Sequence, residues 1–169
     1  MTYILSLFPS IDVFVLGLFC LLLILHLIFI NKSRLFADVI AAYTAFFLVV
    51  LAPLLYPPAA VWLSSHPLAR VAAFLVVAGL LHIVFWHSNI KGFSREVRPF
   101  AFVTSVAYRI AIVGLLVSTV VYFLPSPLHA FLGPLSTFLF GTIWALLAWF
   151  FVPLVLAFVY HYHTKNGWM

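Results

Sequence analysis

Five ionisable side chains lie inside or at the edge of long apolar runs, and they are the residues of this chain that could do chemistry. They are Asp12, His26, Asp38, His82 and Arg109. Burying an ionisable group in hydrocarbon is costly, so such residues are candidates for a functional site. Carboxylates and a guanidinium can pair, and histidines can carry protons or bind metal ions. We expect all of these except Asp12 to form an intramembrane polar cluster.

The two central histidines should lie at similar depth. His26 comes six residues before Lys32 and His82 nine residues before Lys91, and both apolar runs are expected to point the same way. Two histidines on facing helices could bind a haem iron, which would make the chain a b-type haem anchor, or could relay protons. The alternative is that each makes a hydrogen bond between helices or reaches the membrane interface.

The two aspartates in the apolar runs have simpler alternatives. Asp38 follows Arg34 by four residues, so both lie on one helix face and could pair at the membrane boundary. A pair between Asp38 and Arg109 would instead fix the packing of the second and fourth helices. Asp12 begins the first apolar run, where the helix dipole favours a carboxylate, and we expect it to be a boundary residue.

Other catalytic patterns are absent from the sequence. It contains no Walker loop, GxGxxG, GxSxG, CxxC or HExxH motif. Asp12 and Asp38 are expected at opposite membrane faces, which argues against paired-carboxylate chemistry. Cys20 is the only cysteine and cannot form an intramolecular disulfide. His161 and His163 lie among aromatic residues typical of an interfacial belt. We therefore expect a protein that is not an enzyme and has no bound metal.

Composition indicates the solvent of this protein. Hydrophobic residues make up 67% of the 169 residues and charged residues only 7%, whereas a soluble domain has about 25% charged residues. Such a chain cannot cover its surface with solvated groups, so its solvent must be lipid. The net charge is +5, but the basic residues lie at the ends of apolar runs, as membrane topology requires, and this excludes a nucleic-acid partner.

The sequence predicts an all-α, polytopic transmembrane helix bundle of about five spans in a single domain, residues 1–169. In lipid, every backbone polar group must be bonded within its own segment or a closed barrel, and the runs lack the alternation of barrel strands. The fourth run is ambiguous, because residues 100–108 could either extend the span or lie on the membrane surface. The predicted helices cover about residues 11–30, 35–56, 68–86, 100–124 and 135–160.

The connections predict the orientation. Residues 31–34 are so few that the first two helices should form an antiparallel hairpin, and residues 59–67 and 125–134 are expected to be loops. The longest polar connection carries Lys91, Arg95 and Arg98. Counting Lys and Arg on alternate connections gives an excess on this side, which the positive-inside rule assigns to the cytoplasm. We therefore expect the N-terminus outside and the C-terminus in the cytoplasm.

Small residues predict where helices approach closely. Ala37, Ala41 and Ala45 recur every four residues on the second helix, a spacing typical of tight packing in membranes. Gly79 in the third helix and Gly114 in the fourth are likewise expected to allow close helix packing.

The first half of the chain resembles the colicin V production family of small bacterial inner-membrane proteins. The resemblance is carried by Ile11-Asp12, by the basic turn Lys32-Ser33-Arg34, by the second helix ending in Leu54-Leu55-Tyr56-Pro57-Pro58, and by a third helix beginning near Leu68. It covers about residues 10–87. The glycine-and-arginine turn of that family is missing, and a fifth helix is added. The resemblance implies a bacterial envelope protein with an accessory role, and no catalytic residues.

Three functions fit these features. The first is a non-enzymatic accessory or scaffold subunit of a membrane complex, which binds other membrane subunits through its helix faces and the basic loop 88–99. The same loop could also bind lipid headgroups. The second is a small channel or transporter that acts as a homo-oligomer, with the polar cluster lining a path. The third is the haem anchor that uses His26 and His82. In each case the chain is expected in the cell membrane, as a multi-pass protein.

Overall fold

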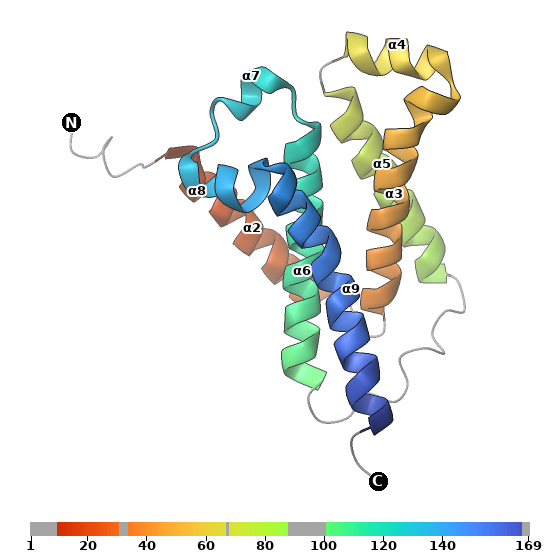
Figure 1. Cartoon of the computed structure of the whole chain (residues 1–169), viewed down its shortest axis with the longest axis vertical. Coiled ribbons are helices and arrows are strands. Elements are labelled where there is room, and N and C mark those ends of the chain that lie inside the picture. Colours follow the sequence, from red (N-terminus) through yellow and green to blue (C-terminus); the bar gives the residue numbers. More distant parts are fainter. Residues whose placement is uncertain (1–9, 31–33, 67, 88–100, 167–169) are drawn as a thin grey trace, which may run out of the picture.

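The computed structural model describes residues 10–30, 34–66, 68–87 and 101–166, and all regular structure in these ranges is helical. Five helices are long (Figure 1). They are α2 (Ser10–Phe29), α3 (Leu35–Leu55), α5 (Ala69–His87), α6 (Ala101–Phe123) and α9 (Ile143–Asn166). The predicted all-α fold is therefore confirmed for the described residues.

Short helices connect the long ones. These are α4 (Pro57–Ser65), α7 (Ser126–His129), α8 (Pro134–Ser136) and the π-helix η3 (Thr137–Gly141). The prediction of plain loops over residues 59–67 and 125–134 is therefore wrong. Prolines at the first positions of α4, α7 and α8 explain these helices, because a proline there loses no hydrogen bond and already has a helical φ.

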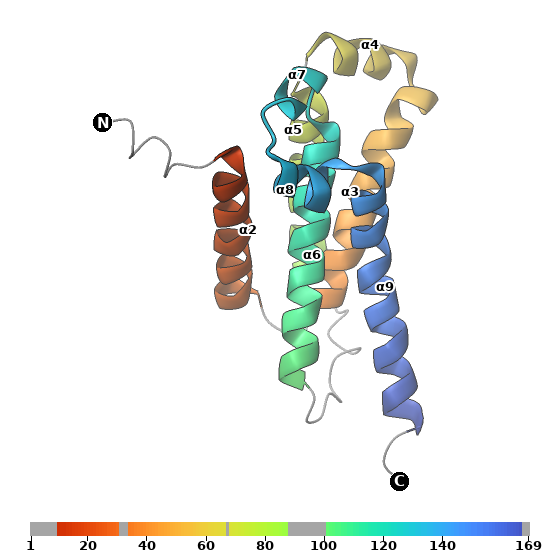
Figure 2. The same cartoon turned by 60° about the vertical axis from the view of Figure 1, so that its left-hand side comes forward.

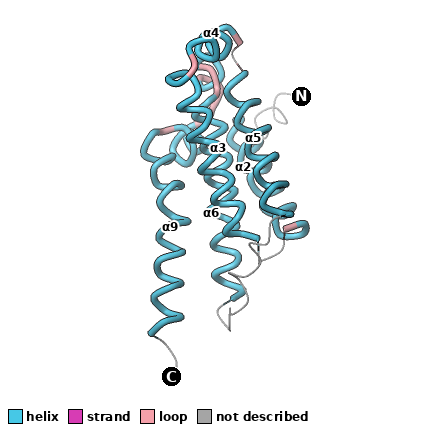
Figure 3. The backbone as a smooth tube through the Cα atoms, turned by 90° about the vertical axis from the view of Figure 1, so that its right-hand side faces the viewer, coloured by secondary structure: helices cyan, strands magenta, loops and turns pink. Residues whose placement is uncertain are grey.

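The apolar helices are those of a membrane-associated bundle. Helices α2, α3 and α6 are each long and apolar enough to cross a membrane. The number rises to five if each of two bent pairs forms one span, namely α4 with α5, bent by 116°, and α8–η3 with α9, bent by 51°. Successive long helices point in opposite directions, and α4 and α7 lie together at one end of the bundle (Figure 1; Figure 3).

The fourth predicted helix is continuous. Residues 101–108 belong to α6, which forms a single apolar segment from Val103 to Phe123. Residues 101–108 are therefore part of the same helix as the apolar segment that follows them.

The fifth predicted helix, residues 135–160, is interrupted. Thr142 is extended, with φ −98° and ψ 154°, and it separates η3 from α9. The Thr142 hydroxyl accepts a hydrogen bond from the Ala145 backbone N–H at 3.0 Å, so it caps the N-terminus of α9. Neighbouring side chains compensate the disturbed backbone, because the Trp149 indole donates to the Leu139 carbonyl and the Ser118 hydroxyl to the Phe140 carbonyl.

Helix α2 lies at the edge of the bundle, as Figure 2 shows. It packs against α6 and α8, whereas α3 packs mainly against α5. The predicted hairpin of the first two helices is thus antiparallel in direction, but its two helices do not pack along each other. The reason is that the small-residue face of α3 is already occupied, since Ala37, Ala41 and Ala45 are all buried and Ala45 packs with Phe74 and Phe123.

The two predicted packing glycines differ. Gly114 is buried, and a Cβ added there would overlap the Trp149 ring of α9. Gly79 is exposed and has open space around it, so the expectation that Gly79 mediates close packing is wrong. Helix α6 is therefore the central helix, with α9 fitted tightly against it at Gly114.

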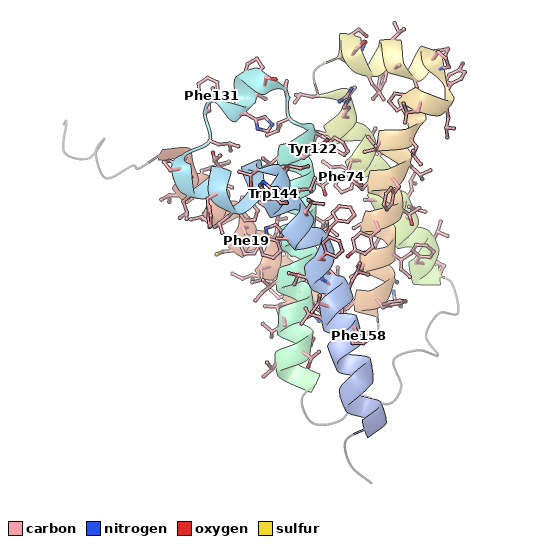
Figure 4. The ribbon with its side chains drawn as sticks, in the orientation of Figure 1. Phe19, Phe74, Tyr122, Phe131, Trp144 and Phe158 are labelled. Carbon is pink, nitrogen blue, oxygen red and sulfur yellow. The ribbon has the colours of Figure 1, made fainter. Side chains whose placement is uncertain are left out.

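Large apolar side chains cover the outside. Phe74 is fully buried, whereas Phe131, Trp144 and Phe158 (Figure 4) are each more than 60% exposed. A surface of this kind is unfavourable in water and matches hydrocarbon.

Candidate functional site: a buried cluster of two histidines, an aspartate and an arginine

The helices bring four of the sequence-predicted residues together. His26 lies in the last turn of α2 and Asp38 in the first turn of α3. His82 comes from the last third of α5, and Arg109 from the first half of α6. These helices alternate in direction (Figure 1), and the contacts between the four side chains show that they meet. We call His26, Asp38, His82 and Arg109 the polar cluster.

Asp38 is the centre of the polar cluster. Its side chain is 7% exposed, and its Oδ1 atom lies 2.5 Å from Nδ1 of His82. Its Oδ2 atom lies 3.5 Å from Nε2 of His26. Both contacts lie within ion-pair distance. One carboxylate therefore links α3 to both α2 and α5.

Arg109 holds the C-terminal end of α2. Its guanidinium donates to the backbone carbonyl of His26 and, at 2.6 Å, to that of Ile30. The Nε–H donates to the Ser105 hydroxyl at 3.4 Å. The His26 carbonyl also accepts from the Ile30 backbone N–H at 3.2 Å. The C-terminal end of a helix carries a partial negative charge, so the guanidinium stabilises this end.

The contacts of His26 fix its tautomer. Nδ1 of His26 lies 3.3 Å from Nη1 of Arg109. A guanidinium can only donate, so in this contact Nδ1 is the accepting nitrogen, and Nε2 faces Asp38. His26 thus lies between the Arg109 guanidinium and the Asp38 carboxylate.

The predicted pair of Asp38 with Arg109 is wrong in detail, because His26 lies between the two charges. Arg34 occupies the N-cap position of α3, four residues before Asp38, and its pairing with Asp38 stays a prediction.

The polar cluster does not fit a haem bound by His26 and His82. Both ring nitrogens of His26 already face partners, and the Asp38 carboxylate lies between the two imidazoles. A porphyrin iron would need those nitrogens to face each other across the ring. Within the described ranges no group of three His, Cys, Asp or Glu side chains has the geometry to hold a metal ion.

Asp12 forms a second polar contact of α2, near its N-terminal end. Its carboxylate accepts hydrogen bonds from the backbone N–H of Ser136 at 2.7 Å and of Leu135 at 3.3 Å. It therefore caps α8 rather than its own helix. Gly133 permits this contact, because a Cβ at that position would overlap the carboxylate.

An apolar layer separates the two polar regions. Along α6, Arg109 is followed by Ile112, Val113 and Leu115, each 1% exposed, before the buried Ser118. Side chains of α2 and η3 pack against the same layer, among them Phe19 and Phe140. The middle of the bundle is therefore filled by hydrocarbon side chains.

Sequence reasoning missed three contacts. They are the Ser105 bond to Arg109, the Asp12 cap of α8, and the bond of the Tyr43 hydroxyl to the Phe150 carbonyl, which joins α3 to α9. The Gly133-Pro134 pair, a helix-start pattern, was the available signal for the second.

The predicted basic loop, with Lys91, Arg95 and Arg98, lies outside the described residues.

No family model, no curated protein and no solved structure matches this chain. The functional proposal therefore depends on the contacts of α2 and of the polar cluster.

Proposed function

We propose that the chain is a five-span protein of the cell membrane with its N-terminus outside and its C-terminus in the cytoplasm. The alternating directions of α2, α3, α5, α6 and α9 support this topology (Figure 1), as do the two bent pairs, each long enough to count as one span. The excess of Lys and Arg on one side supports the orientation. A location in the bacterial inner membrane follows from the family resemblance and stays a prediction.

The topology is tested by reporter fusions. A reporter active only in the cytoplasm should be active after Met169 and inactive after His129, in the connection before α8. Activity at both sites, or the reverse pattern, would contradict five spans in this orientation.

We propose further that the protein is a non-enzymatic accessory or scaffold subunit, which binds another membrane protein through α2. The exposure of α2 supports this role. Only 6% of its apolar segment is buried, against 61% for α6. One face packs on the bundle through Leu16, Phe19 and Leu23, while Phe14 and Ile28 are 73% and 69% exposed. A partner helix could cover this open face without disturbing the bundle.

The test is photo-crosslinking in the native membrane. A photoreactive amino acid at Phe14 or Ile28 should give one reproducible protein adduct. The matched control is the same amino acid at Phe19, which faces Phe140 and Trp149 within the chain and should give no adduct. If Phe14 and Ile28 also give no adduct, α2 faces lipid alone and the accessory role is wrong.

The polar cluster favours a second candidate, a small proton or ion carrier. Buried ionisable side chains are typical of such pathways in membranes. The apolar layer beyond Arg109 means that carriage would need a rearrangement of α6 or its neighbours. Purified protein in proteoliposomes should show proton flux that Asp38→Asn abolishes if this candidate is correct, and no flux above empty liposomes if the accessory role is.

A further inference from the structure

We propose that α4 binds the surface of the lipid bilayer, with its axis along the membrane and Trp62 as its anchor at the headgroup boundary. Helix α4 runs across the end of the bundle at which α3 ends and α5 begins (Figure 1; Figure 3). The surface position does not depend on the proposed orientation, and only the assignment to the outer leaflet rests on it. Helix α5 then crosses the membrane without α4, so the proposed number of spans stays the same.

The length and direction of α4 fit a surface helix. Its nine residues extend about 13 Å as a helix, far less than the ~30 Å of a hydrocarbon core. The 19 residues of α5 extend about 28 Å, which is nearly that thickness. The axes of α4 and α5 differ by 116°, so α4 lies closer to the plane of the membrane than to the direction of α5.

The side chains around α4 are apolar and exposed. Leu54 and Leu55, which precede α4, are 76% and 79% exposed. Within α4, Val61 and Trp62 are 69% and 53% exposed. The sequence from residue 39 to residue 69 contains no Asp, Glu, Lys or Arg. Such a surface is unfavourable in water, and it continues the apolar surface of α3, so we assign lipid to this side of α4.

The polar side chains at the C-terminal end of α4 already have partners within this segment. The Ser64 hydroxyl donates to the Val61 carbonyl at 2.8 Å and the Ser65 hydroxyl to the Trp62 carbonyl at 3.0 Å. Nδ1 of His66 is 3.0 Å from the Trp62 carbonyl, and the two rings lie 5.2 Å apart between centroids. Polar groups with internal partners depend less on water, so α4 can enter the poorly hydrated boundary between headgroups and hydrocarbon.

Two side chains indicate the depth of α4. Trp62 is half-exposed, and tryptophan is enriched at the membrane interface because its ring is apolar and carries one polar N–H. Arg70, in the first turn of α5, is exposed. An exposed guanidinium on a membrane helix reaches the headgroups rather than the hydrocarbon. The start of α5, and with it the end of α4, is therefore at headgroup depth.

The experiment measures the depth of α4 in the membrane. A nitroxide spin label is placed at Val61 or at Ser65, which are one turn apart and both exposed, in a Cys20→Ser background and in phosphatidylcholine–phosphatidylglycerol nanodiscs. Collisions with oxygen, which concentrates in hydrocarbon, and with a water-soluble nickel chelate give the depth of each label. We expect equal depths for the two labels. Both should lie between two controls, a label on native Cys20 in the middle of α2 and a label at the exposed Ser126 of α7.

Three results would overturn the proposal. A depth difference of about 6 Å between the two labels, the rise of four helical residues, would make α4 part of the span. Nickel access equal to that at Ser126 would place α4 in water, and poor access of both reagents would mean that protein covers it. These results are independent of any partner of α2, and the reporter fusions test the topology separately.

A variant tests the anchor. Trp62→Gln should move the Val61 label towards water and raise its nickel access, because the side chain that holds α4 at the boundary is lost. The matched control is Trp144→Gln, which removes another exposed tryptophan at the start of α9 and should leave the depth of the Val61 label unchanged. Helix content by circular dichroism shows whether both variants fold. An unchanged depth in folded Trp62→Gln would overturn the assignment of Trp62 as the anchor.

Discussion

At the scale of residues, the polar cluster shows what the sequence can predict about a buried site and what it cannot. Loop charges place His26 and His82 at one depth, and the structure places both beside Asp38. The sequence does not give the rotation of each helix about its axis, so it could not show that His26 separates Asp38 from Arg109. That order depends on α2 packing against α6, which no pattern in α2 predicts.

Gly114, with Gly79 as its control, gives a prediction at the scale of residues. Gly114→Ala should destabilise the protein by about 1–3 kcal/mol, because an added methyl group has to displace a packed ring. The ring is that of Trp149. Thermal unfolding in detergent, followed by tryptophan fluorescence, measures the change.

Gly79→Ala is the control for that prediction. Its Cβ meets open space, and alanine favours a helix over glycine by about 1 kcal/mol, so this variant should be as stable as the wild type or more so. Equal melting temperatures for both variants would mean that α6 and α9 are not in tight contact at Gly114.

At the scale of elements, residues typical of helix starts mark the boundaries of the short helices. Pro57-Pro58 follows the end of α3, and prolines in the first turn are typical of a new helix, which here is α4. Thr142 is likewise a common capping residue, and its bond to Ala145 marks the true start of α9. The sequence is apolar on both sides of these helix starts, so hydrophobicity alone does not mark where α4 and α9 begin.

The contact of Asp12 with α8 yields the prediction at this scale. Asp12→Ala should destabilise the protein, because it removes hydrogen bonds from two backbone N–H groups to a charged carboxylate. Gly133→Ala should destabilise for the same reason, because its methyl group would occupy the position of the carboxylate. The two costs should not add in the double variant, since each change removes the same contact. Additive losses in chemical unfolding would show that the contact does not hold α2 to α8.

At the scale of the whole molecule, the apolar outer surface indicates that the protein is surrounded by lipid. The sequence predicted this from 7% charged residues, and the structure agrees, with large apolar side chains exposed on every long helix. Composition could not predict how unevenly the helices are buried, because α2 and α3 are similarly apolar but differ widely in burial.

Cys20 provides a test of whether the exposed surface of α2 faces lipid. It lies in the middle of α2 and is exposed on the outside of the bundle, so in a membrane it should face lipid. A charged thiol reagent should fail to label it in intact vesicles from either side, while a lipid-soluble reagent labels it. A cysteine introduced at the exposed Ser126 of α7 is the positive control for the charged reagent. Labelling of Cys20 by the charged reagent would place the middle of α2 in water.

The two polar attachments of α2 have a consequence for biosynthesis. Asp12 is bonded to residues 135 and 136 and His26 to residue 109, so α2 depends on partners that are synthesised well after it. Until α6 and α8 enter the bilayer, the aspartate and the histidine of α2 lack these contacts. A nascent chain stalled before residue 101 should therefore hold α2 loosely, and is the form most exposed to membrane proteases and insertion chaperones.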